Sequence, residues 1–375
     1  MTTILYGVAG EGNGHAIRAK TIIDELKKEH TLHIFSHGNG YRFLKQFFSV
    51  QRILGFHMYY INNTVSSFLT GTINTIKFPL MVLASLQYPV AFLKHKPKIV
   101  ITDFEPFLMY WAKIFNVPTI SIDNQHSITN TQIDKIKSQW LTEVYSKLVI
   151  HTFLPKPGNT IITTFFPTEV KSKNTVLVPP VIKKEVQEIK NKKTKSKEQK
   201  QKSKEQKNKE HIFVYQTSPS YKRMFPILKK INKQFIIYGF NKEIKEGNLT
   251  FKKFNTEEYL EDLATADAVI INGGFTTLSE ALYLEKPVFS IPIKRQFEQI
   301  INGHYLNKLQ YGMAVRDISE ENFTKFLNNK EKYKQNIRKI KWNGNEDLFR
   351  VLDKVIMQNS VKEQKTTTVA PTRRG

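Results

Sequence analysis

One stretch constrains the fold of this chain more than any other, because a strand signal, a glycine pair and a helix signal follow one another directly. Residues 268–271 are four apolar residues of strand type, Gly273 and Gly274 come next, and leucines recur at helical spacing from Leu278. Glycine lets a backbone approach a ligand closely, and a helix N-terminus presents free N–H groups and the positive end of its dipole. The stretch therefore predicts strand, tight turn and helix, with a phosphate site at the turn.

Glu280 adds a second ligand contact to this stretch. The helix is expected to begin at Thr276 or Thr277, which places Glu280 about one turn further in. A carboxylate accepts hydrogen bonds from two neighbouring hydroxyls at once, and a ribose 2′,3′-diol offers two such hydroxyls. The sequence therefore favours a nucleotide over a bare phosphate.

The run from Gly273 through Glu280 to Asn302 resembles the donor-binding half of GT-B glycosyltransferases of the family 28 type, which include the bacterial enzyme that adds N-acetylglucosamine to lipid I. It is also similar to the signature box of plant UDP-glycosyltransferases. The resemblance implies that Glu280 holds the ribose, that the diphosphate lies at the turn, and that two later residues contact the donor sugar. The donor-binding residues implied are Gly273, Gly274, Thr276, Thr277, Glu280, Glu298 and Gln299. Plant enzymes carry His where this chain has Asn272, so that phosphate contact stays open.

Length and composition set the frame for this prediction. A chain of 375 residues is long enough for two domains, each with its own core. It has no cysteine, which suits a reducing compartment. No signal peptide is apparent, because Met1 leads straight into a strand-like run without a basic start. A cytoplasmic location is therefore expected.

The net charge of +24 raises the possibility of a nucleic-acid partner. Residues 181–210 contribute +7 and residues 360–375 contribute +3, which leaves +14 for the rest of the chain. Basic and aromatic residues are not interleaved in the Lys-rich segment, and no nucleic-acid motif is recognised. No nucleic-acid partner is therefore expected, and an anionic membrane surface or phosphate-bearing substrates explain the charge.

A glycine-rich turn follows the first predicted strand, residues 3–9. Its glycines fall at positions 10, 12 and 14, and a dinucleotide fingerprint would need an acidic residue at the end of the second strand. That strand, residues 31–35, is followed by Ser36, His37 and Gly38, so NAD binding is not expected.

The same turn resembles the loop that opens family 28 glycosyltransferases, where a Gly-His pair begins the first helix. By this resemblance His15 is the general base on the acceptor hydroxyl or a partner of the donor phosphate, and imidazole is suited to take a proton near neutrality. The alternative is a histidine that only caps or packs the loop. The residues expected to form the acceptor or phosphate loop are Gly12, Asn13, Gly14, Arg18 and His126.

Two further strands are expected to end in polar groups. Residues 99–102 are followed by Asp103, and residues 117–122 lead to His126, a second candidate base. In the resembled plant enzymes an Asp at a comparable strand end orients the base, so Asp103 is expected to hold His15. The alternative is a helix N-cap. Glu105 makes an Asp-x-Glu pair that suits Mg²⁺, but the resemblance implies no metal and no cofactor beyond the UDP-sugar.

Residues 53–93 form an apolar segment with one lysine, Lys77, and no acidic residue. The uncharged run that follows Lys77, residues 78–93, has 16 residues, fewer than the roughly 20 needed to span a bilayer. A Lys-rich cluster at residues 94–98 follows at once. The pattern predicts a non-spanning face that binds anionic lipid, with core helices of the first domain as the alternative.

Strands alternate with helices in both halves, so the predicted fold class is α/β with parallel sheets. The resemblance makes it GT-B, two Rossmann-like domains facing a cleft. The expected parts are an acceptor-binding domain at residues 1–180, a Lys-rich linker at 181–210, a UDP-sugar-binding domain at 211–358 and a disordered tail at 359–375. The linker is interpreted as solvated chain or a weak exposed helix.

The predicted function is transfer of a sugar, N-acetylglucosamine or another hexose, from a UDP-sugar to an acceptor hydroxyl, with inversion implied by the resemblance. A lipid or lipid-linked glycan is the expected acceptor, and the expected place is the inner face of the cell membrane. Two alternatives stay open. One is a UDP-N-acetylglucosamine 2-epimerase-like isomerase of the same fold, and the other is a non-enzymatic basic protein.

Overall fold

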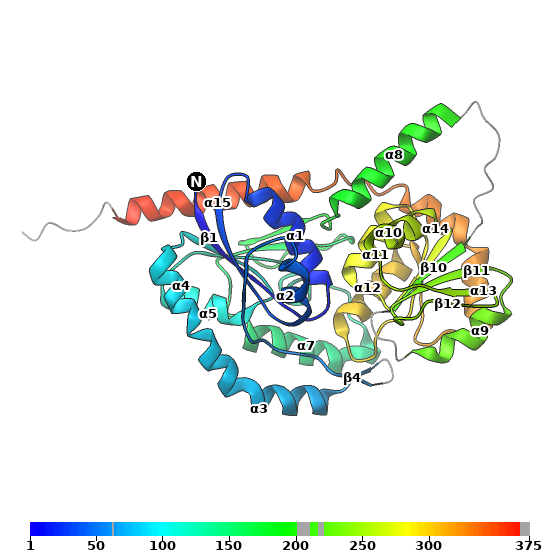
Figure 1. The fold of residues 1–375 in the computed structure, drawn as a ribbon, viewed down its shortest axis with the longest axis horizontal. Coiled ribbons are helices and arrows are strands. Elements are labelled where there is room, and N and C mark those ends of the chain that lie inside the picture. Colours follow the sequence, from blue (N-terminus) through cyan, green and yellow to red (C-terminus); the bar gives the residue numbers. More distant parts are fainter. Residues whose placement is uncertain (62–63, 201–210, 217–220, 368–375) are drawn as a thin grey trace, which may run out of the picture. The chain divides into compact units, whose positions relative to one another are not determined.

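The computed structural model describes residues 1–61, 64–200, 211–216 and 221–367. The chain divides into two compact units (Figure 1). Unit 1 consists of residues 1–57, 71–181 and 343–375, and unit 2 of residues 58–70 and 182–342.

Unit 1 is built on a seven-stranded sheet of order β3-β2-β1-β6-β7-β8-β9 in which every neighbouring pair is parallel. The strands are β1 Thr3–Val8, β2 Thr31–Ser36, β3 Val50–Arg52, β6 Ile99–Asp103, β7 Thr119–Asp123, β8 Asn159–Thr163 and β9 Thr175–Val178. The central strands are buried on both faces, as an apolar run such as Ile4 to Tyr6 requires. Since parallel strands end at one edge, β6 and β7 bring their terminal aspartates to the same side of the sheet.

Helices cover both faces of this sheet. The helices of unit 1 are α1 Gly14–Leu26, α2 Gly38–Leu44, α3 Ser67–Ser85, α4 Gln87–His95, α5 Pro106–Ile114, α6 Ser127–Asn130, the 3-10 helix η1 Lys137–Gln139, α7 Trp140–Phe153 and α15 Glu346–Thr367. The core on one face joins α1 and α15 to β1, and the core on the other joins α4 and α5 to Leu5 and Val100. The strand–helix alternation predicted for the first half of the chain is therefore present.

Helix α15 belongs to unit 1 although it ends the described chain. Leu348, Leu352, Val355 and Ile356 pack in one core with Ile4 and Tyr6 of β1. The expected boundary at residue 358 is therefore wrong, because the second unit ends at residue 342. The expected tail is also too long: helix continues to Thr367, since Gln, Lys and Glu are good helix formers, and residues 368–375 lie outside the described part.

Unit 2 has its own seven-stranded sheet, of order β12-β13-β11-β10-β14-β15-β16. Its strands are β10 His211–Tyr215, β11 Gln234–Tyr238, β12 Ile244–Glu246, β13 Leu249–Phe251, β14 Ala268–Ile271, β15 Val288–Ser290 and β16 Gly312–Ala314. All pairs are parallel except the edge pair of β12 and β13. Its helices are α8 Lys184–Lys200, η2 Lys222–Met224, α9 Phe225–Lys230, α10 Thr256–Thr265, α11 Phe275–Tyr283, α12 Phe297–Lys308, α13 Glu320–Asn328 and α14 Lys330–Ile337.

Unit 2 also takes a short segment from the first half of the chain. Residues 58–70 include the hairpin of β4 Tyr60–Ile61 and β5 Thr64–Val65, and the Val65 N–H donates to the Lys294 carbonyl at 3.2 Å. The expected first domain, residues 1–180, therefore lacks this segment. Nothing in the local sequence signals a contact made with a residue so distant in the chain.

The Lys-rich segment begins as helix α8 and not as free linker. Val186 is fully buried, and Lys190 lies over the Tyr283 ring at 4.5 Å. The first turns of α8 are thus held against unit 2. The remainder of the predicted linker, residues 201–210, lies outside the described part.

Helices α3 and α4 form one apolar segment in which residues 67–95 are long and apolar enough to cross a membrane, judged by length and composition alone. The expectation that this segment is too short was wrong, because the uncharged run was counted from Lys77 while the helix extends through that single lysine. The segment is partly committed to unit 1, since Met81, Tyr88 and Phe92 are buried.

Candidate functional site

The glycine turn of unit 2 has the geometry predicted for it. Gly273 follows β14 with φ of 97°, a left-handed conformation that favours glycine, and a Cβ there would lie 2.7 Å from Ser290 Oγ. Gly274 is the N-cap of α11, and its Cβ position is open. Helix α11 begins at Phe275, so its free N–H groups start at the turn.

Two asparagines brace this turn. Asn302 Nδ2 donates to the Gly273 carbonyl at 3.1 Å, and Asn272 Nδ2 donates to Gln216 Oε1 at 2.7 Å. Both asparagines are buried. Asn302 is the last residue of the motif, and its side chain fixes the backbone at which the predicted phosphate site begins.

Glu280 is buried in the second turn of α11, and the residues around it come from three other segments. Its Oε1 lies 3.0 Å from Lys183 Nζ, which precedes α8. Burial raises the pKa of Glu280, and the Lys183 ammonium offsets part of that effect. Burial raises the pKa values of Tyr215 and Tyr259, and the Glu280 carboxylate raises them further.

The neighbouring turn of α11 lies in the same cluster. Thr277 Oγ1 is 3.5 Å from the Tyr259 hydroxyl, and Lys183 Nζ lies 5.8 Å from the centre of the Tyr259 ring. Because Thr277 and Glu280 are three positions apart, they share one face of the helix. The structure thus brings together the predicted ribose residue and a predicted diphosphate residue, and adds a cation that sequence analysis missed.

Glu298 and Gln299 open helix α12, close in sequence to the braced turn. Gln299 is buried, and its Oε1 accepts from the Ile293 N–H at 3.0 Å, whereas Glu298 is half-buried. The amide of Gln299 therefore orders the loop before α12. The predicted contacts of these two residues with a donor sugar remain predictions.

In unit 1 the first glycine-rich turn follows β1. Gly12 has φ of 70°, Asn13 is the N-cap of α1, and Gly14 and His15 are its first residues. The Gly10 N–H donates to His37 Nε2 at 2.9 Å, and burial lowers the pKa of His37 to about 3. His37, set aside when NAD binding was excluded, therefore holds the turn as a neutral imidazole.

The expected contact between Asp103 and His15 is present. His15 Nδ1 lies 2.6 Å from Asp103 Oδ1. A carboxylate only accepts, so Nδ1 carries the proton and Nε2 is left as the basic nitrogen. The Gln125 side-chain nitrogen lies 3.5 Å from His15 Nε2. The catalytic role of the pair stays a prediction.

Arg18 forms a bidentate ion pair with the same carboxylate. Its Nε donates to Asp103 Oδ2 at 2.8 Å and its second terminal nitrogen to Oδ1 at 2.6 Å, while the other terminal nitrogen reaches Asn124 Oδ1 at 3.0 Å. Burial opposes the charge, yet Asp103 raises the pKa of Arg18 above its usual range. Arg18 was expected in the acceptor or phosphate loop. Its guanidinium orients Asp103, and ligand binding by Arg18 stays a prediction.

The backbone turns sharply between the two acids of the Asp-x-Glu pair. Phe104 has φ of 59°, a strained conformation for a bulky residue, and its ring stacks at 6.2 Å from His15. Glu105 caps α5 by accepting from the Phe107 and Leu108 N–H groups at 3.2 and 2.8 Å. Burial raises the pKa of Glu105 to about 7. The pair is thus divided between two tasks, and no cluster of three or more metal-ligating side chains occurs among the described residues.

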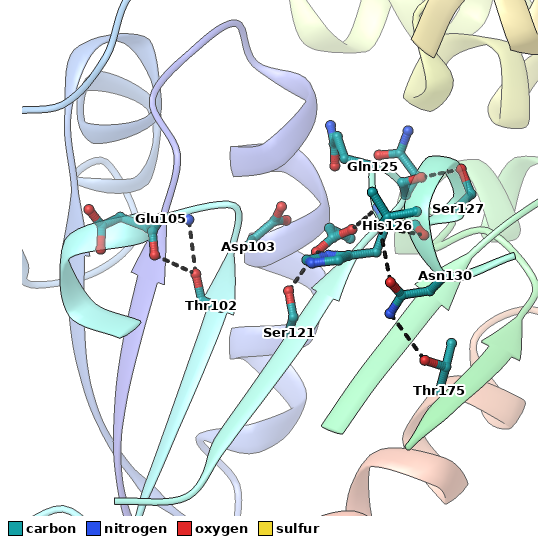
Figure 2. Close-up of polar contacts among 12 residues, drawn as sticks. Thr102, Asp103, Glu105, Ser121, Gln125, His126, Ser127, Asn130 and Thr175 are labelled. Atoms are coloured by element: carbon teal, nitrogen blue, oxygen red, sulfur yellow. Dashed lines mark hydrogen bonds and ion pairs between the residues drawn. The ribbon is translucent and has the colours of Figure 1, made fainter. Parts of the chain in front are cut away.

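A second buried carboxylate–histidine pair ends β7. Asp123 Oδ2 lies 2.7 Å from His126 Nδ1, and Ser121 donates to the same oxygen at 2.5 Å (Figure 2). Burial alone would raise the pKa of Asp123, but the His126 imidazolium and these hydrogen bonds lower it below its usual range. Against the opposing effect of burial, Asp123 raises the pKa of His126. The pair thus favours the protonated form of His126, and a role of His126 as a second candidate base stays a prediction.

Comparison with protein families adds the decisive observation. Residues 2–330 match the model described as "Glycosyl transferase family 1". The chain belongs to this family. The expectation of a glycosyltransferase is thereby confirmed, whereas membership of family 28 itself stays a prediction.

A curated relative of this family 1 chain is UDP-N-acetylglucosamine–N-acetylmuramyl-(pentapeptide) pyrophosphoryl-undecaprenol N-acetylglucosamine transferase 3 from Bacillus cereus. The two are 29% identical over 117 residues, a match that covers 29% of this chain and 33% of the relative. The chain thus matches only about a third of that relative's length.

Solved structures agree on the fold. MurG from Acinetobacter baumannii is 12% identical with a TM-score of 0.57, over 94% of this chain and 100% of that one. The calicheamicin glycosyltransferase CalG4 is 13% identical with a TM-score of 0.57, over 99% of this chain and 100% of that one. The prediction of a GT-B fold with two Rossmann-like domains is confirmed.

Proposed function

We propose that this glycosyltransferase moves a sugar, N-acetylglucosamine or another hexose, from a UDP-sugar to a hydroxyl of a lipid or lipid-linked glycan, with inversion. The observation that carries the donor side is the cluster of unit 2, where Glu280 and Thr277 lie on one face of a helix whose N-terminus follows a braced glycine turn. Such a helix end favours a diphosphate, and a buried carboxylate one turn away favours a ribose diol. The name of the Bacillus cereus relative specifies UDP-N-acetylglucosamine, which supports the same donor class.

The proposed chemistry is a single displacement at the anomeric carbon. The acceptor oxygen bonds to that carbon as its proton passes to His15 Nε2, and the bond to the donor diphosphate breaks with its electron pair on the departing oxygen. Asp103 keeps the Nδ1 proton in place and stabilises the imidazolium, and Arg18 fixes Asp103. The helix α11 N-terminus receives the negative charge of the leaving group.

The lipid side of the proposal is supported by an apolar surface on unit 1. Helices α3, α4 and α7 expose Ile76, Leu80, Leu83, Leu86, Val90, Leu93, Trp140, Leu141, Val144 and Leu148, each more than half exposed. A groove of about 350 Å³ among α3, α5 and α7 is lined largely by aromatic and aliphatic side chains, including Phe78, Phe107 and Trp111. Monomeric soluble proteins rarely expose such large apolar patches.

Exposed lysines accompany this surface, and they would attract anionic lipid headgroups. Lys77, Lys94, Lys96 and Lys113 are all exposed on α3 to α5 or directly after α4. Because Trp111 Nε1 donates to Ser85 Oγ at 3.2 Å and Asn74 Nδ2 donates to the His57 carbonyl, the inner face of α3 is tied to unit 1. We therefore infer that α3 and α4 lie on the membrane surface and do not cross it, with the inner leaflet as the expected site.

The test begins with a panel of UDP-sugars and thermal unfolding. A ligand at about a hundred times its dissociation constant stabilises by about 2.7 kcal/mol, so the true donor raises the melting temperature above that of the other sugars. The protein is then incubated with that donor, with and without a lipid-linked acceptor. Release of UDP only with acceptor supports transfer. An epimerised UDP-sugar without acceptor indicates the isomerase, and no protection by any UDP-sugar overturns the donor assignment.

A further inference from the structure

Lys183 forms an ion pair with the Glu280 carboxylate, which is the group proposed to bind the ribose of the donor. Its ammonium is 3.0 Å from Glu280 Oε1, yet no aligned hydrogen bond reaches that oxygen, although the Glu280 side chain is almost completely buried. A buried acceptor with a charge contact but no aligned donor is suited to exchange its partner, because an unmade hydrogen bond at a buried group is costly. A ribose diol supplies two O–H donors for this oxygen pair.

The ammonium of Lys183 also lies on the side of α11 that leads to the diphosphate site. Lys183 is 5.8 Å from the Tyr259 ring, and the Tyr259 hydroxyl is 3.5 Å from Thr277 Oγ1 in the first turn of α11. A rise of about 1.5 Å per residue puts Glu280 roughly 8 Å from the helix start. A lysine side chain is a flexible stem with a compact charge at its end, so rotation about its bonds carries the charge part of that distance toward the turn.

Other lysines of this region have different partners. Lys286 donates to the Ala266 carbonyl, and Lys294 lies 3.3 Å from Asp317 Oδ2. Lys183, in contrast, has an ion-pair partner that the donor itself would engage through its ribose. A diphosphate carries at least two negative charges, and a cation in a partly buried site interacts with it more strongly than in water.

We propose that Lys183 is a ligand of the donor diphosphate that is held on Glu280 until the donor arrives. The ribose diol takes the Glu280 carboxylate, and the displaced ammonium pairs with the diphosphate beside the α11 N-terminus. Binding of the nucleoside and binding of the phosphates are thereby coupled. This inference rests on the proposed function, since it assumes a nucleoside diphosphate at Glu280.

The coupling is tested with uridine and UDP as probes, by calorimetry on the full chain. Lys183→Met should leave uridine binding unchanged or tighter, because it removes the competitor for Glu280, and should weaken UDP binding. The ratio of UDP affinity to uridine affinity should fall roughly tenfold or more, as expected for a lost charge-assisted bond. Lys183→Arg keeps the charge and should keep most of the ratio.

Lys190→Met is the matched control, because Lys190 is a half-buried lysine of the adjoining helix α8 that pairs with Glu285 at 3.8 Å. It should not change the ratio. Glu280→Gln should weaken both ligands and preserve the ratio, whereas the double variant Glu280→Gln/Lys183→Met should lose it. Since Lys183 has no carboxylate to hold in the Glu280→Gln background, a merely structural lysine would be dispensable there.

The outcomes separate this inference from the proposed function. If the wild-type chain binds uridine and UDP but Lys183→Met leaves their ratio unchanged, Lys183 is only the partner of Glu280 and the inference is overturned. If the wild-type chain binds neither, the donor assignment fails as well. If Lys183→Met does not fold, Lys183→Arg is compared with Glu280→Gln. A changed ratio of UDP affinity to uridine affinity in Lys183→Arg, with an unchanged ratio in Glu280→Gln, would contradict a role that depends on the charge of Lys183 alone.

Discussion

The carboxylate of Asp103 contacts His15 Nδ1 at 2.6 Å across 88 positions of sequence. The contact links the carboxyl end of β6 to the first turn of α1, and Arg18, one turn further along α1, grips the same carboxylate. One acid thus fixes the tautomer of a histidine while a buried arginine fixes the acid. This arrangement is testable because a similar pair, Asp123 and His126, ends the neighbouring strand.

Asp103→Asn should reduce turnover strongly and also destabilise the fold. An amide in place of the carboxylate no longer fixes the Nδ1 proton, and a base that is lost or misoriented typically costs about 10²–10⁴-fold in rate. Arg18 would lose its buried counter-charge, which costs on the order of 3–5 kcal/mol. Turnover with the identified donor and urea unfolding measure the two effects.

Asp123→Asn is the matched control for that variant. It removes another fully buried carboxylate from a histidine, so a comparable loss of stability is expected with a smaller loss of turnover. If Asp123→Asn abolishes turnover while Asp103→Asn does not, the base assignment moves to His126.

His15→Ala should lower turnover with little change in the affinity for UDP. The proposed task of His15 is to accept the proton of the acceptor hydroxyl, and 14% of its side chain is exposed, so Nε2 remains reachable. A loss of about 10²–10⁴-fold in kcat is expected, measured by UDP release alongside calorimetry with UDP. An equal fall in UDP affinity would make His15 a phosphate ligand instead.

Much of this architecture could be predicted from the sequence, and the reason is local. The buried strands are apolar runs, and the turn at Gly273 and Gly274 is recognisable from neighbouring residues alone. Contacts between residues far apart in the sequence could not be predicted in this way. The Arg18–Asp103 pair joins positions 85 apart, and Lys183 reaches Glu280 from the segment interpreted as linker. No periodicity records which side chain a lysine or arginine will meet after folding.

Segment lengths were misjudged for a related reason. Lys77 marks the limit of the uncharged run. One lysine on an exposed helix face does not end a helix, however, because its charged end can remain in water. The boundary expected at residue 358 lies too far along the chain, since the amphipathic pattern of α15 indicates a buried face without saying against which sheet that face packs.

Glu280→Ala should weaken binding of both uridine and UDP by roughly 1.5–3 kcal/mol, because the hydrogen bonds of a charged group to the shared ribose are lost. Glu285→Ala serves as control, since Glu285 follows the same helix but pairs with Arg338 at 3.0 Å. Calorimetry with each ligand provides the comparison. Unchanged affinity in Glu280→Ala would remove this residue from the donor site.

Glu105 should make stability depend on pH. Its pKa is raised from 4.5 to about 7 by burial, so its contribution is fully present below about pH 4.5 and is lost as pH rises toward and through 7. Each pH unit between the two values corresponds to about 1.4 kcal/mol, which gives roughly 3 kcal/mol in all. Glu105→Gln, which cannot ionise, should gain stability relative to the wild type over this window. Free energies of unfolding at several pH values test this, and parallel curves for the two proteins would contradict it.

The apolar surface of unit 1 should bind anionic membranes reversibly. Each lysine held near an anionic surface contributes about 1 kcal/mol, so a few such as Lys94, Lys96 and Lys113 suffice in addition to the apolar contacts. Co-sedimentation should therefore be stronger with anionic than with neutral vesicles. It should weaken as salt is raised, because charge attraction is screened over about 8–10 Å near physiological ionic strength.

Substitutions inside and outside the proposed surface distinguish membrane binding by that surface from non-specific binding of any exposed apolar residue. Leu83→Gln and Trp140→Gln remove apolar groups that are 62% and 60% exposed on α3 and α7, and both should reduce vesicle binding. Ile244→Gln is the matched control, because Ile244 is 50% exposed on the edge strand β12 of unit 2 and is not one of the residues that form the proposed surface. Equal binding to neutral and anionic vesicles would eliminate the electrostatic contribution. Protein that stays in membranes at high salt and leaves only with detergent would show that residues 67–95 insert, and no binding to either vesicle would favour a soluble acceptor.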